Sequence, residues 1–91
     1  MARIELTPDL SNCIKTVARR EYDNLVSDYL QTGEKAQGFE EKIELLRTFL
    51  ESADFKKLRS ESEKHLLKGQ NIKFILHQED NEAKWELKIE S

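Results

Sequence analysis

The stretch of sequence that decides the fold lies near the carboxyl end of the chain, as Asn71-Ile72-Lys73-Phe74-Ile75-Leu76-His77-Gln78 and Ala83-Lys84-Trp85-Glu86-Leu87-Lys88-Ile89-Glu90. Apolar and polar residues alternate in both segments, and Ile75 is the one interruption. Successive side chains of a β-strand point to opposite faces of the sheet. The pattern therefore predicts two strands, each with one buried face and one face in water.

The two predicted strands are separated by a short polar segment that suits a tight turn. Asp80-Asn81 lies at its centre, and Asp and Asn tolerate the positive φ that hairpin turns require. Folding the chain about this point places the apolar residues of both strands on one face, so the register is well specified. The predicted opposite pairs are Leu76 with Trp85, Phe74 with Leu87, and Ile72 with Ile89.

The amino-terminal residues predict a short strand followed by a long helix. Arg3 to Leu6 alternates, and Thr7-Pro8 then resembles a helix start, because Thr caps a helix and Pro suits its first turn. Apolar residues at helical spacing predict a helix from Pro8 to about Leu30. About 23 residues would span roughly 35 Å, whereas a domain of this size is only about 30 Å across. We expect such a helix to reach beyond its own domain or to use its end against something else.

The middle of the chain, residues 39–68, predicts two helices rather than one. Phe39, Ile43, Leu46 and Leu50 form one apolar stripe, and a second apolar set begins at Phe55. The second set lies about 140° around the helix axis from the first, so one straight helix would bury opposite sides at its two ends. A break at Ser52-Ala53-Asp54 removes the conflict, with Ser52 or Asp54 as the new cap.

These elements predict an α+β fold in which two or three helices pack on one face of a small antiparallel sheet. The sheet would contain the carboxyl-terminal hairpin and the short amino-terminal strand, because an isolated hairpin is only marginally stable. The alternative is that the amino-terminal segment pairs with another chain. The length of 91 residues predicts a single domain, residues 1–91, with a thin core that a second copy or a partner could complete.

The sequence contains no catalytic signature, so we expect a binding role rather than chemistry. The net charge of −3 argues against general coating of nucleic acid, and no apolar run reaches the length of a signal peptide or a membrane span. We therefore expect a cytoplasmic protein without a membrane partner. Cys13 is interpreted as a small apolar residue of the first helix, and His65 and His77 as solvated residues. No spacing predicts a catalytic set, a metal site or a cofactor.

Basic residues gather in and after the third predicted helix, on a chain that is acidic elsewhere. The candidate contacts for phosphate groups or for an acidic partner are Lys56, Lys57, Arg59, Lys64, Lys68 and Lys73. The alternative interpretation is a solvated helix face with ordinary intrahelical ion pairs such as Lys57–Glu61. Only Phe55 lies close enough in sequence to stack on a base, and it belongs to the apolar set.

The predicted sheet suggests how the chain associates. Ile75 stands among charged residues on the outer face, either as an isolated surface residue or as a contact with another chain. The unpaired edge of a short sheet can recruit a strand from a partner, while Lys84 and Lys88 discourage unspecific aggregation. We therefore expect a small non-catalytic protein-interaction module that forms a homodimer. The alternative function is a nucleic-acid-associated accessory protein that uses the basic third helix.

Overall fold

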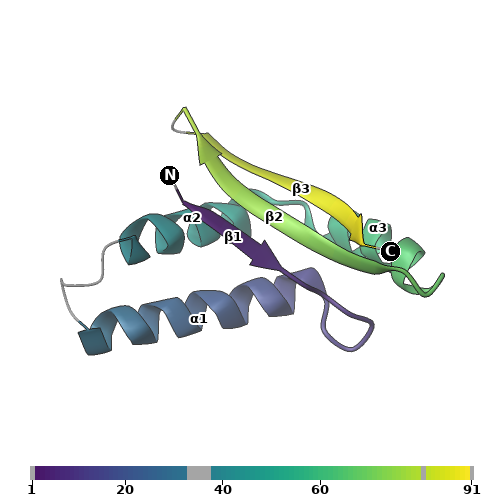
Figure 1. Ribbon diagram of the computed structural model, residues 1–91, viewed down its shortest axis with the longest axis horizontal. Coiled ribbons are helices and arrows are strands. Elements are labelled where there is room, and N and C mark those ends of the chain that lie inside the picture. Colours follow the sequence, from purple (N-terminus) through teal and green to yellow (C-terminus); the bar gives the residue numbers. More distant parts are fainter. Residues whose placement is uncertain (1, 33–37, 81, 91) are drawn as a thin grey trace.

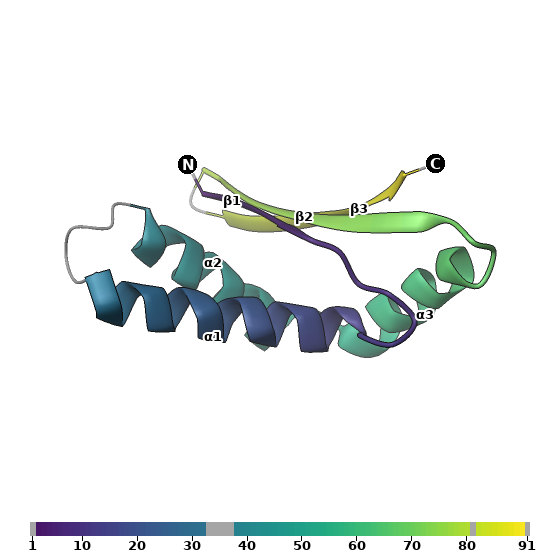
Figure 2. The same ribbon diagram turned by 60° about the horizontal axis from the view of Figure 1, so that its bottom comes forward.

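The computed structural model describes residues 2–32, 38–80 and 82–90 and has an α+β fold. The chain runs through β1 (Arg3–Leu6), α1 (Ile14–Thr32), α2 (Phe39–Ser52), α3 (Phe55–Leu66), β2 (Asn71–Glu79) and β3 (Glu82–Glu90). The strands form an antiparallel sheet in the order β1-β2-β3. The helices cover one face of this sheet, so the molecule has two layers (Figures 1 and 2).

The predicted register of the hairpin is confirmed. Leu76 lies opposite Trp85, Phe74 opposite Leu87, and Ile72 opposite Ile89. Asp80 adopts a positive φ of 48°, as the predicted turn requires, while Asn81 lies outside the described residues. β1 pairs with β2, from Arg3↔His77 to Leu6↔Phe74, so the amino-terminal strand joins the hairpin of its own chain.

The core lies between the sheet and the helices. Ile72, Phe74 and Leu76 of β2 are buried against Leu46 and Phe49 of α2 and the inward side chains of α1. Phe49 links three elements, because its ring meets Phe55 of α3 at 5.3 Å and Trp85 of β3 at 5.1 Å between ring centres, both edge to face. The sequence pattern singled out Leu46 but not Phe49, the larger of the two buried residues.

The predicted start of the first helix at Pro8 is wrong. The Asp9 carboxylate accepts hydrogen bonds from the backbone N–H groups of Ser11 (2.8 Å) and Asn12 (2.7 Å), which holds this segment in a turn. Pro8 is buried and Leu10 is 61% exposed. The helix begins at Ile14, and its 19 residues span about 28 Å. This length is less than the roughly 30 Å expected across the domain, so the length argument for an overhang does not hold.

The break between the second and third helices is confirmed. α2 ends at Ser52, and the Asp54 side chain accepts a hydrogen bond from the backbone N–H of Lys57 at 3.2 Å, which caps α3. α3 ends in a turn at Gly69, whose φ of 80° favours glycine. This turn leads the chain into β2. At the other end of the helical layer, the Tyr29 hydroxyl donates to Glu40 and joins α1 to α2.

Candidate interaction surface

The longest open feature of the sheet is the outer edge of β3. β2 lies between the other two strands, so within the described residues β3 is hydrogen-bonded on one side only (Figure 1). The other outer strand, β1, has four residues, whereas β3 has nine. Unpaired backbone groups along an edge strand can bind a further strand, and short edges limit such pairing. β3 is therefore the edge at which an added strand can form more backbone hydrogen bonds.

The inward face of β3 carries an apolar row that the helices cover incompletely. Trp85 and Leu87 are half-buried against the core, and Ile89 is 48% exposed. A groove of about 350 Å³ runs between α3 and β3, and Leu58, Phe74, Trp85 and Leu87 contribute its apolar lining. The row continues the core to the edge of the molecule. A strand placed beside β3 would remove more of this apolar surface from water.

The open face of the sheet is charged and internally paired. The Lys73 amino group lies 3.2 Å from Glu5 on β1 and 2.8 Å from Glu90 on β3, so it joins all three strands. Its hydrogen bonds to Glu90 and Glu5 raise the pKa of Lys73. Ile75 lies on this face but is only 5% exposed. It lies between Glu5 and Glu86 on the neighbouring strands, so it is not the exposed surface residue that one of our interpretations required.

The structure separates the six basic candidates. Lys73 lies on the open face of β2, away from the helical layer that contains α3, and is held by two glutamates. Arg59 donates to Glu63 at 3.1 Å within α3. The remaining four are exposed, and none has an ion-pair partner within the described residues; they are Lys56, Lys57, Lys64 and Lys68. The predicted Lys57–Glu61 pair does not form.

Cys13 lies at the amino terminus of α1 rather than inside the helix. Its carbonyl accepts the hydrogen bond of Val17 at 3.0 Å, and its Sγ lies 3.3 Å from the Thr16 hydroxyl. Hydrogen bonds from the Thr16 side chain and backbone lower the pKa of the Cys13 thiol, and the positive charge of Arg59 adds to this effect. The interpretation of Cys13 as a buried apolar residue of the helix is therefore wrong, because the thiol is half-buried and hydrogen-bonded.

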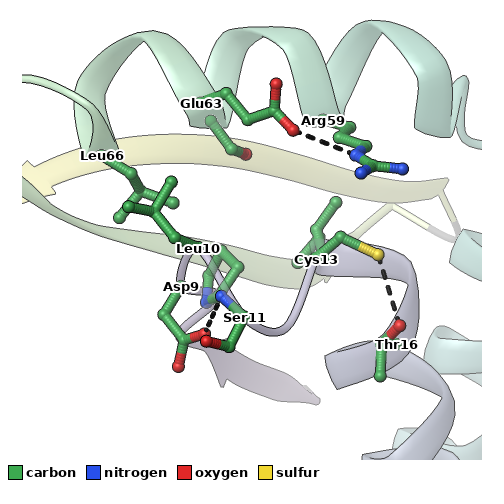
Figure 3. A pocket seen from close by; sticks show the side chains of 11 residues that line it. Asp9, Leu10, Ser11, Cys13, Thr16, Arg59, Glu63 and Leu66 are labelled. Carbon is green, nitrogen blue, oxygen red and sulfur yellow. Dashed lines mark hydrogen bonds and ion pairs between the residues drawn. The ribbon is translucent and has the colours of Figure 1, made fainter.

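A pocket of about 120 Å³ opens beside this thiol, between α3 and the turn that precedes α1 (Figure 3). Its lining includes Asp9, Leu10 and Cys13 from the amino-terminal side and Arg59 and Leu66 from α3. Sequence reasoning missed this juxtaposition, because residues 13 and 59 are brought together only by the packing of α1 on α3. The available signal was Asp9-Leu10-Ser11-Asn12, which suits a turn closed by the aspartate side chain.

The histidines do not form a site together. His65 Nδ1 bonds the Gln70 side chain at 2.9 Å, and His77 lies on β2. Among the described residues, no group of three or more His, Cys, Asp or Glu side chains is arranged to hold a metal ion. None of the described helices has the length and apolar character needed to cross a bilayer.

Comparisons with known proteins place this architecture in a family. Neither the curated proteins nor the solved structures gave a match. A protein-family model matches residues 2–90, a range that contains all three strands, all three helices and the β3 edge. The chain therefore belongs to this family, which is uncharacterised.

Proposed function

We propose that this chain is a non-catalytic protein-interaction module that works as a homodimer, and that the free edge of β3 is the surface through which it associates. The observation that carries the proposal is the apolar row on β3, which runs from the half-buried Trp85 to the half-exposed Ile89 beside unpaired backbone groups. Strand addition satisfies those groups and covers the row in the same step.

The length of β3 supports this assignment over the opposite edge of the sheet. Nine residues offer enough backbone donors and acceptors for a continuous ladder, whereas β1 offers four. A thin core is also a reason for self-association, because a chain of 91 residues buries a modest fraction of its surface. The over-long first helix, which the sequence suggested as a further reason, does not support the proposal.

The experiment is sedimentation velocity from about 1 to 100 µM, a range that brackets micromolar dissociation constants. Ile89→Lys is the test variant and Leu67→Lys the matched control, because Leu67 is an exposed leucine outside the sheet. Covering half an isoleucine side chain stabilises a complex by about 1 kcal/mol, and a symmetric dimer contains two. Ile89→Lys should therefore weaken the dimer at least tenfold, by about 1.4 kcal/mol or more. A wild-type monomer throughout, or equal effects of both variants, would contradict the proposal.

A second candidate function is contact with nucleic acid through α3. The observation that favours it is the exposure of Lys56, Lys57 and Lys64 without ion-pair partners in the described part of the chain. Binding of this kind would weaken steeply as salt rises, with a slope set by the number of phosphates neutralised. Charge reversal at Lys56, Lys57 and Arg59 would abolish it and leave self-association intact. A flat salt response, or no binding at low salt, would eliminate this candidate.

A further inference from the structure

The outward side chains of β3 alternate in sign along the whole strand. In order they are Glu82, Lys84, Glu86, Lys88 and Glu90, and they occupy the open face because they lie two residues apart. When two identical strands pair antiparallel about a two-fold axis, each residue faces the one at the same distance on the other side of the axis. The position of the axis therefore decides whether like or opposite charges meet.

The charge pattern restricts where the axis can lie. With the axis at Glu86, this residue faces itself and Lys84 faces the partner's Lys88, so every outward pair repels. With the axis at either neighbouring apolar residue, every lysine faces a glutamate instead. Directly opposed like charges destabilise antiparallel strands, and opposite charges stabilise them. Two central registers therefore remain, one with the axis at Trp85 and one with the axis at Leu87.

The apolar row distinguishes these two registers. An axis at Leu87 sets Leu87 against itself and Ile89 against the partner's Trp85, so every apolar residue from Trp85 to Ile89 gains a neighbour. An axis at Trp85 leaves both Ile89 and Glu90 beyond the complementary stretch, because β3 begins at Glu82 and Lys88 already faces the partner's Glu82. Because Ile89 is 48% exposed in the single chain, covering it favours the axis at Leu87.

The ion pairs inside the single chain support the same axis. Within residues 2–32, 38–80 and 82–90, neither Glu86 nor Lys88 has an ion-pair partner. Lys88 faces Lys73 across the hairpin, and Lys73 is already held by Glu5 and Glu90. An axis at Leu87 places Glu86 of each copy opposite Lys88 of the other, so the two charges that lack partners pair with each other. An axis at Trp85 would instead place Glu86 opposite Lys84, which Glu79 already holds at 3.3 Å.

From these observations we infer that two copies of the chain join β3 to β3 in antiparallel orientation with the two-fold axis at Leu87. The product is one continuous sheet in the order β1-β2-β3-β3-β2-β1, with the helices of both copies on the same face. The partner at this edge is thus a second copy of the chain. The inference rests on the proposed function. It adds the register of the two β3 strands and the alternating charges along β3 that favour this register.

The first test is a set of single-cysteine variants in a Cys13→Ser background. Residues that face each other across an antiparallel pair have Cα atoms about 4.5–5.5 Å apart, which a disulfide can bridge. Leu87→Cys should therefore give a disulfide-linked dimer under mild oxidation, whereas Glu86→Cys and Trp85→Cys should not. More efficient cross-linking of either alternative would overturn the register.

The second test uses charge and does not depend on Trp85, whose ring packs in the core. Glu86→Lys alone sets lysines opposite lysines in two places and should weaken the dimer on the order of tenfold. Adding Lys88→Glu restores opposite charges about an axis at Leu87, so the double variant should return to within about threefold of the wild type. About an axis at Trp85 the double variant would place like charges at all four pairs and weaken the dimer further.

The outcomes separate the two proposals. A wild-type chain that stays monomeric contradicts the proposed function and the inference together. A wild-type dimer that fails to cross-link through Leu87→Cys, or that the double charge variant does not restore, overturns the register alone. A dimer that meets both expectations supports the axis at Leu87.

Discussion

Replacing Phe49 by alanine is expected to lower the free energy of unfolding by about 3 to 5 kcal/mol, the usual cost of removing a buried phenylalanine. Phe49 is fully buried on α2. Its ring also makes edge-to-face contacts with Phe55 and Trp85, each of which is worth about 0.5 to 1.5 kcal/mol. The substitution therefore loosens α3 and β3 as well as α2.

The expected loss is large for a protein of this size. At about 0.05 to 0.15 kcal/mol per residue, 91 residues give a total stability of roughly 5 to 14 kcal/mol. The variant would retain part of this, and its melting temperature would fall by about 12 °C or more, since 1 kcal/mol shifts Tm by about 4 to 8 °C. Phe39→Ala is the matched control, because Phe39 lies on the same helix but is only half-buried. Its cost should be less than half as large.

The assay is urea unfolding followed by circular dichroism and by tryptophan fluorescence. Trp85 is the only tryptophan of the chain and touches Phe49, so its fluorescence reports this part of the core directly. All variants are compared at two protein concentrations, because dimer formation makes the midpoint depend on concentration. A loss below about 1 kcal/mol for Phe49→Ala, or equal losses for Phe49→Ala and Phe39→Ala, would refute the assignment of Phe49 as the residue that joins the two layers.

Three further outcomes are expected. Asp54→Ala removes the cap of α3 and should lower the free energy of unfolding by about 1 kcal/mol in urea unfolding, whereas Ser52→Ala should change it little. A larger loss for Ser52→Ala would contradict Asp54 as the cap. The alkylation rate of Cys13 by iodoacetamide increases with pH as the thiolate forms. Because the pKa of Cys13 is lowered in the folded chain, this increase should occur at a lower pH in the folded chain than in urea. Thr16→Val should move that rise upward, and an unchanged profile would contradict the role of its hydroxyl. Lys73→Met removes the ion pairs that link Glu5 and Glu90 and should lower Tm at low salt. The difference in Tm from the wild type should shrink in 1 M salt, where the screening length falls to roughly 3 Å. A difference that does not depend on salt would indicate lost packing instead.

The sheet was predictable from sequence because the alternation of apolar and polar residues in β2 and β3 is compatible with one register. A slip of one residue between β2 and β3 would move the side chains of Trp85 and Leu87 to the solvent face of the sheet. The hairpin register therefore follows from the alternation alone. The break at Asp54 was equally constrained, because the phase of the apolar residues forbids one straight helix. Both features depend on which residues of a strand or helix lie on its buried face, and the spacing of apolar residues in the sequence specifies that face directly.

The start of α1 was not predictable by the same means. Asp9 after Thr7-Pro8 suits the first turn of a helix, but it also suits a turn closed by its own carboxylate, and both use the same hydrogen bonds to backbone N–H groups. Pro8 is fully buried in the folded chain, and its burial depends on tertiary packing. The position of Cys13 beside Arg59 was hidden for the same reason.

The order of strands in the sheet has a consequence for how the chain folds as it is made. β1 is synthesised first, yet its only strand partner among the described residues is β2, and Arg3 pairs with His77. At about 5 to 20 residues per second, the ribosome needs roughly 4 to 15 s to reach that partner. During this interval Ile4 and Leu6 have no sheet to join, whereas α1 and α2 can already form and meet. The helical layer is thus available early, and closure of the sheet waits for nearly the whole chain.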